Sequence, residues 1–74
     1  MENIEINTIE DLRAVYDIIP HEDIAYIVFN NYGDRIAMIY KRSGTVLVRE
    51  GHIFNYLIET RQAIKKNGVN RFFN

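Results

Sequence analysis

Apolar side chains near the start of the chain recur every three to four residues, which is the spacing of an amphipathic helix. The stripe consists of Ile9, Leu12, Val15, Tyr16 and Ile19. Thr8 and Asp11 have the spacing of a helix N-cap followed by an acidic residue at the third helical position. Pro20 pushes the residue before it out of the helical conformation. The pattern therefore predicts a helix over residues 8–19.

Three later segments are rich in β-branched and aromatic residues, and short polar turns separate them. They cover residues 24–29, 35–41 and 45–49. Strands joined by connections this short pair in the antiparallel direction. The middle of the chain is therefore predicted to form a three-stranded meander.

The first of these strands is apolar on both of its faces. One face would carry Ile24, Tyr26 and Val28, and the other Ala25, Ile27 and Phe29. A strand with one face in water should alternate between apolar and polar residues. We therefore expect either that the second face of the sheet tolerates water or that another copy of the chain covers it.

The C-terminal third again shows helical spacing. The apolar positions of residues 52–66 predict a second helix, which Lys65 and Lys66 in the last turn and Gly68 just beyond would end. Phe72 and Phe73 close the chain, and two aromatic rings left in water would be an aggregation hazard, so we expect this tail to dock. The order helix, three strands, helix predicts an α+β fold with one domain over residues 1–74.

Length and composition limit how this domain can be stabilised. The chain has 74 residues, 47% of them apolar, and no cysteine. Disulfides and thiolate metal sites are therefore excluded, and a core this small needs very close packing or burial against a partner. The acidic N-terminus lacks the pattern of a secretory signal, and no apolar run approaches the roughly 18 residues of a membrane span. We expect a cytoplasmic protein without membrane contact.

The formal net charge of −1 hides two opposed halves. Residues 1–34 carry eight acidic side chains and one basic one, whereas residues 35–74 carry two acidic and eight basic ones. Such asymmetry bears on association rather than on fold. The acidic first helix could lie against the basic last helix of a second copy, or the two could neutralise each other within one chain.

Candidate catalytic and metal-binding residues are few. His21, Glu22 and Asp23 form the densest cluster of possible ligands, but three consecutive residues cannot all point at one ion, and a solvated connection is the preferred interpretation. Ser43 is the only serine and lies beside Gly44 in a predicted turn. The glycines are spread singly at element boundaries, unlike a phosphate-binding loop. We expect no enzymatic activity, no cofactor and no metal.

The basic half offers a possible nucleic-acid contact. Its candidate residues are Arg35, Lys41, Arg42, Arg49, Lys65 and Lys66. Nucleic-acid sites combine positive charge with aromatic rings that stack on bases, and aromatic residues are interleaved here. The isoelectric point of about 6.1 lies below the range expected for such a domain. Nucleic-acid binding is therefore the alternative rather than the leading hypothesis.

The chain is short and rich in Ile and Asn, and its elements are predicted in the order helix, three strands, helix. Two further features are the stretches Asn7–Leu12 and Gly51–Tyr56. In these features it resembles the YopT-like proteins of the SPbeta prophage, a family without an established function. The resemblance covers the whole chain and carries over no catalytic or binding residues. It implies a compact α+β domain in the bacterial cytoplasm, for which a dimer is an option.

The leading hypothesis is a non-enzymatic accessory protein that self-associates as a homodimer and binds a host or phage macromolecule. The residues predicted for self-association are Tyr26, Val28, Phe72 and Phe73. In a third hypothesis, the acidic first helix mimics nucleic acid and blocks a host protein.

Overall fold

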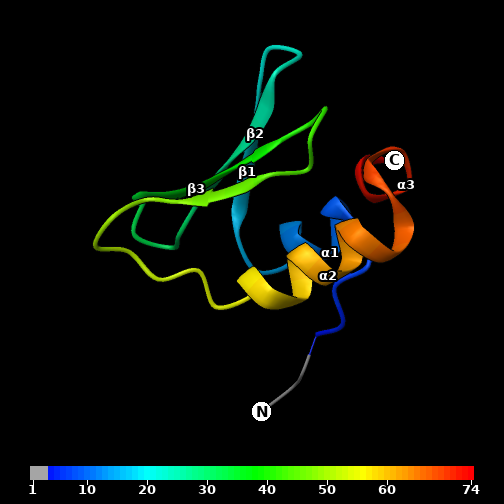
Figure 1. The fold of residues 1–74 in the computed structure, drawn as a ribbon. Coiled ribbons are helices and arrows are strands. Elements are labelled where there is room, and N and C mark those ends of the chain that lie inside the picture. Colours follow the sequence, from blue (N-terminus) through cyan, green and yellow to red (C-terminus); the bar gives the residue numbers. More distant parts are fainter. Residues whose placement is uncertain (1–3) are drawn as a thin grey trace.

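A four-stranded antiparallel sheet forms one layer of the fold (Figure 1). The computed structural model describes residues 4–74, so that residues 1–3 of the acidic N-terminal segment lie outside the described part. The strands are β1 (Asp17–His21), β2 (Ala25–Phe29), β3 (Arg35–Tyr40) and β4 (Val46–Val48), and they lie side by side in chain order. The predicted α+β class is confirmed, but the sheet has four strands rather than three.

The additional strand lies where the sequence predicted the second half of the first helix. Helix α1 (Ile9–Arg13) is only five residues long, and β1 follows after a turn. In β1, Ile18 lies opposite Val28 and Pro20 opposite Tyr26. The prediction of a helix over residues 8–19 is therefore wrong after Arg13, because pairing with β2 buries Ile18 against the core.

The predicted start of α1 is confirmed. Thr8 is its N-cap, and the Asp11 carboxylate accepts hydrogen bonds from the backbone N–H groups of Asn7 at 2.8 Å and Thr8 at 3.0 Å. These two backbone hydrogen bonds favour the ionised carboxylate and lower the pKa of Asp11. The cap thus fixes where the chain turns into the helix.

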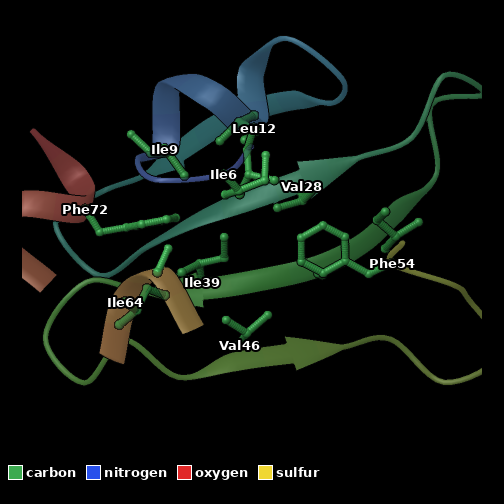
Figure 2. Packing of buried hydrophobic residues seen from close by; sticks show 13 residues of the cluster. Ile6, Ile9, Leu12, Val28, Ile39, Val46, Phe54, Ile64 and Phe72 are labelled. Atoms are coloured by element: carbon green, nitrogen blue, oxygen red, sulfur yellow. The ribbon is translucent and has the colours of Figure 1, made fainter. Parts of the chain in front are cut away.

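The described part of the chain has three helices. They lie on one face of the sheet (Figure 1). Helix α2 (Leu57–Asn67) begins five residues later than predicted, because residues 52–56 belong to the loop that follows β4. It ends at Gly68 as expected, and α3 (Val69–Phe73) follows directly. Figure 2 shows Phe72 pointing from α3 into the cluster of buried side chains that also contains Ile9 and Ile39.

The core lies between these helices and the sheet. Leu12, Val28 and Ile39 are completely buried in it. A bulge between β2 and β3 lets the adjacent residues Ile36 and Ala37 both contribute to this core. One cluster of buried side chains therefore joins the sheet to all three helices.

The turn between β3 and β4 approaches the helices very closely at Gly44. A Cβ atom at this position would lie 2.6 Å from Cγ2 of Ile64 and 3.0 Å from Cγ1 of Val69, and its φ of +74° disfavours other residues. Arg61 of α2 also donates a hydrogen bond to the carbonyl of Val46 at 3.0 Å. These contacts fix α2 against the β4 side of the sheet.

Candidate interaction surface

The four residues predicted for self-association lie on the covered side of the sheet. Val28 and Phe72 are completely buried within one chain. The ring of Tyr26 stacks on that of Phe73 at 5.4 Å between centroids. The predicted docking of the tail therefore takes place inside a single chain. We correct the self-association assignment for Val28 and Phe72, because these two side chains have no exposed surface left for a second copy.

The opposite face of the sheet is the second apolar face that the sequence of β2 predicted. Strand pairing places Ile19 opposite Ile27, Ile27 opposite Met38, and Met38 opposite Leu47. These four side chains therefore form a straight apolar row across all four strands, on the face that alternates with the core-facing residues. We call them the apolar row, and the face on which they lie the open face.

The apolar row is accessible to solvent. Ile19 and Leu47, on the two outer strands, are 52% and 53% exposed. Ile27 and Met38, on the inner strands, are partly shielded by their neighbours in the sheet. Among residues 4–74, the helices all lie on the other side (Figure 1). Contiguous apolar surface of this kind, bordered by polar groups, is typical of an interaction site.

One end of the open face is charged. Asp17 lies opposite Phe29, which lies opposite Arg35, so the acidic residue stands on β1 and the basic one on β3. Arg49 continues β4 beyond Leu47, and with Arg35 and Met38 it lines a shallow hollow of about 160 Å³. The one ion pair within residues 4–74 joins Arg13 to Glu10, so neither Asp17 nor these two arginines is paired there. The open face thus has an acidic margin and a basic margin.

Both outer edges of the sheet are obstructed. Arg13 donates a hydrogen bond to the carbonyl of Ile18 at 3.0 Å, and Arg61 does the same for Val46 at the other edge. Because backbone groups alternate along an antiparallel strand, the nitrogen of Pro20 faces outward like the carbonyl of Ile18, and it offers no donor. Capped carbonyls, an edge proline and a three-residue β4 are features that prevent edge-to-edge strand pairing.

The six basic residues predicted to contact nucleic acid do not form one patch. Arg35 and Arg49 are neighbours, but Lys41 lies beyond the opposite end of β3. Its ammonium group is 4.8 Å from the centroid of the Tyr26 ring and donates to the carbonyl of Glu22 at 3.4 Å. Arg42 follows Lys41 in the turn after β3, and Lys65 and Lys66 lie in the last turn of α2. The six residues are therefore divided among three separate places in the fold, two in each.

The two oppositely charged parts of the sequence meet within one chain. Glu5 and Lys66 line the same hollow between the N-terminal segment and α2. Asn67, at the end of α2, donates a hydrogen bond to the carbonyl of Asn7 at 3.3 Å. These contacts bring the N-terminal segment, which precedes α1, against α2, and both arrangements of the acidic and basic helices stay predictions.

The remaining candidates for chemistry lie in turns. Within residues 4–74, no three His, Asp or Glu side chains come close enough to hold a metal ion together. His21, at the end of β1, and Glu22 and Asp23, in the turn that follows, are all exposed. The Ser43 hydroxyl accepts a hydrogen bond from the backbone N–H of Thr45 at 3.1 Å, which is a turn-stabilising role.

Comparison with known proteins leaves the open face as the main guide to function. No family model, no curated protein and no solved structure matches the chain. The resemblance to YopT-like prophage proteins therefore stays a prediction. None of the helices in the described part of the chain has the length and apolar character needed to cross a membrane.

Proposed function

We propose that this chain is a non-enzymatic interaction module of the cytoplasm that forms a homodimer through its open face. The observation that carries the proposal is the apolar row, in which Ile19 and Leu47 stay about half exposed although the sheet is complete. Burying aliphatic side chains of this size is favourable by about 1.5–3 kcal/mol each when the burial is full. A second copy offers the same surface and would remove both rows from water.

The dimer would leave other apolar side chains free to bind a different protein. Ile53, in the loop before α2, and Ile58, on α2, are 77% and 66% exposed. Both lie outside the sheet, so face-to-face pairing of sheets does not bury them. We place the binding of a host or phage protein, through which an accessory protein would act, on this side of the molecule.

Sedimentation velocity with Leu47→Lys tests the dimer. The wild-type chain should associate over loading concentrations of about 5–500 µM, which bracket a micromolar Kd. Placing an ammonium group within the apolar row, at its β4 end, should weaken association at least about thirtyfold. A wild-type chain that stays monomeric at every concentration would refute the proposal.

Ile58→Lys is the matched control for this experiment. It introduces the same charge in place of an aliphatic side chain of similar exposure, but on α2. The control should associate like the wild type. Equal loss of association in both variants would show that net charge, and not the open face, governs self-association.

Nucleic-acid binding through the basic half is the alternative function. Its support is the pair formed by Arg35 and Arg49 beside the hollow on the open face. A titration with duplex and single-stranded oligonucleotides at several salt concentrations separates the two functions, because phosphate contacts make affinity fall steeply with ionic strength. Salt-sensitive binding that Arg35→Ala and Arg49→Ala abolish together would favour the alternative.

A further inference from the structure

We infer that the second copy docks with its strands aligned to those of the first, about a two-fold axis that runs parallel to the strands between β2 and β3. This inference rests on the proposed homodimer and adds its geometry, which is set by the edges, the apolar row and the charged end of the open face. In this arrangement β1 of each copy lies over β4 of the other, and β2 lies over β3.

The edges of the sheet disfavour the common alternative, in which two sheets join into one. An added strand needs free backbone groups along an outer edge. Arg13 donates a hydrogen bond to the carbonyl of Ile18 on β1, and Arg61 donates one to the carbonyl of Val46 on β4, each at 3.0 Å. Association must therefore use the face rather than the edge, and aligned sheets pack about 10 Å apart with interdigitating side chains.

The apolar row is self-complementary under this rotation. The axis leaves positions along the strands unchanged and reverses the order of the strands. Ile19 then meets Leu47 of the second copy, and Ile27 meets its Met38. Because the interface is isologous, each contact occurs twice. The two most exposed members of the row cover each other, so no large apolar side chain of the row stays in water.

The charged end selects this axis over the other possible one. Asp17 stands on β1 at the same end of the strands as Arg35 on β3 and Arg49 after β4. A two-fold axis parallel to the strands brings Asp17 over the basic margin of the second copy, twice per dimer. An axis perpendicular to the strands would instead place Asp17 over His21 and Arg35 over Tyr40, so that neither Asp17 nor Arg35 would meet a permanently charged group of opposite sign. Complementary charge fixes orientation more than it raises affinity.

The size of the open face sets the expected strength. Four strands of three to six residues, about 4.8 Å apart and at about 3.3 Å per residue, cover roughly 300 Å². Standard specific interfaces bury about 800 Å² of accessible surface on each partner, and smaller ones are typical of weak association. A micromolar dimer is therefore expected.

A charge exchange tests the geometry. Asp17→Arg makes the charged end of the open face wholly basic, and the double variant Arg35→Asp with Arg49→Asp makes it wholly acidic. Each variant alone should have a Kd on the order of tenfold higher than the wild type at low salt. An equimolar mixture of the two should form a heterodimer at least as tight as the wild-type dimer. The triple variant, with all three substitutions in one chain, should recover the homodimer.

The outcomes separate this inference from the proposed homodimer. If Leu47→Lys abolishes association but the mixture shows no preference for the heterodimer, the dimer stands and the axis parallel to the strands is wrong. If the wild type is monomeric, both fail. Circular dichroism of each variant checks that it folds, and the triple variant provides a second test should either partner fold poorly. Adding about 0.5 M salt should reduce the preference for the heterodimer, since screening weakens exposed charge pairs.

Discussion

The two faces of the sheet are built from the same kinds of residue, but one face is buried and the other is partly exposed to solvent. On the covered face, Val28 and Ile39 are completely buried beneath the helices, whereas on the open face Ile19 and Leu47 stay half exposed. Amino-acid composition does not distinguish the two faces. Even within the single strand β2, apolar side chains point to both faces of the sheet. The helices make the difference, since α2 and α3 can cover only one side. In a chain this short, apolar residues in excess of what its own helices can cover become surface available to a partner.

The largest expected difference between the faces is in the free energy of unfolding. Phe72→Ala removes a completely buried ring from the covered side, where it meets the ring of Phe73 at 5.2 Å. A loss of about 3–5 kcal/mol is expected, from both the lost burial and the cavity left behind. Urea denaturation monitored by circular dichroism measures it.

Phe73→Ala is the control for this prediction. Phe73 is only partly buried, so its removal should cost clearly less than that of Phe72. Equal losses in the two variants would contradict the assignment of Phe72 to the core. If Phe72→Ala fails to fold at all, Phe72→Leu, which keeps most of the apolar volume, should fold with reduced stability.

Gly44→Ala tests the close approach of the β3–β4 turn to the helices. The added methyl group would lie 2.6 Å from Ile64, and the residue has φ of +74°. Overpacking and the left-handed conformation together should cost about 2–3 kcal/mol. Gly33→Ala is the matched control, because its φ is +82° but a Cβ there meets nothing within 4 Å. It should cost about 1 kcal/mol, and similar losses in both would show that packing against α2 is unimportant.

Several of these features follow from local sequence signals. The cap at Thr8 and Asp11, the strands beginning near Ala25, Arg35 and Val46, and the helix end at Gly68 depend on neighbouring residues, and the structure confirms them. The sequence also shows that β2 is apolar on both sides. This pattern predicts that one apolar face of the sheet is left to water or to a second copy. Local patterns were sufficient wherever a few adjacent residues determine the backbone.

The secondary-structure predictions are wrong where residues distant in the sequence determine the backbone conformation. Ile19 extends the helical stripe, but Ile18 and Ile19 equally fit a strand. Only their pairing with Val28 and Ile27, ten and eight residues later, favours the strand. Pro20 is compatible with the end of a helix, but proline also occurs on edge strands, which is where the structure has it. A helix over residues 8–19 takes Ile19, one of the four members of the apolar row, out of the sheet. The choice between the faces of β2 depended on where α2 and α3 dock, which no local pattern encodes.

Thr60→Val probes a weak point of the covered side. The Thr60 hydroxyl is completely buried and has no hydrogen-bond partner among the described residues. Valine keeps the shape and the branching at Cβ while removing the unpaired oxygen, so stability should rise by about 1 kcal/mol. Thr60→Ala, which also leaves a void, should lower it. A loss of stability in Thr60→Val would mean that the hydroxyl is hydrogen-bonded in solution.

Asp11→Ala tests the cap that starts α1 on the covered side. At pH 7 the change leaves the N–H groups of Asn7 and Thr8 without their acceptor and should cost about 1 kcal/mol. The pKa of Asp11 is lowered in the folded chain, so the stabilisation is present above the ordinary carboxylate pKa of about 3.9. It is lost as the pH falls through the lowered folded value. The difference from wild type should therefore shrink in acid.

Glu10→Ala is the control for the pH dependence. It removes a carboxylate from the same helical turn, but one whose ion pair with Arg13 is exposed to solvent. Exposed pairs contribute little, so its effect at pH 7 should be smaller than that of Asp11→Ala. Urea denaturation at pH 7 and at about pH 3 compares both variants with the wild type. A gap between Asp11→Ala and wild type that widens in acid would contradict the lowered pKa.

The smallest expected effect on unfolding belongs to the open face. In Leu47→Lys the new ammonium group can remain in water, because the position is already about half exposed and no helix lies over it. At concentrations where the chain is monomeric, the free energy of unfolding should change by less than about 0.5 kcal/mol. The wild type should gain thermal stability with concentration, since association stabilises the folded chain, and the variant should not. A large loss of monomer stability in Leu47→Lys would mean that the open face is part of the core, and the distinction between the two faces would fail.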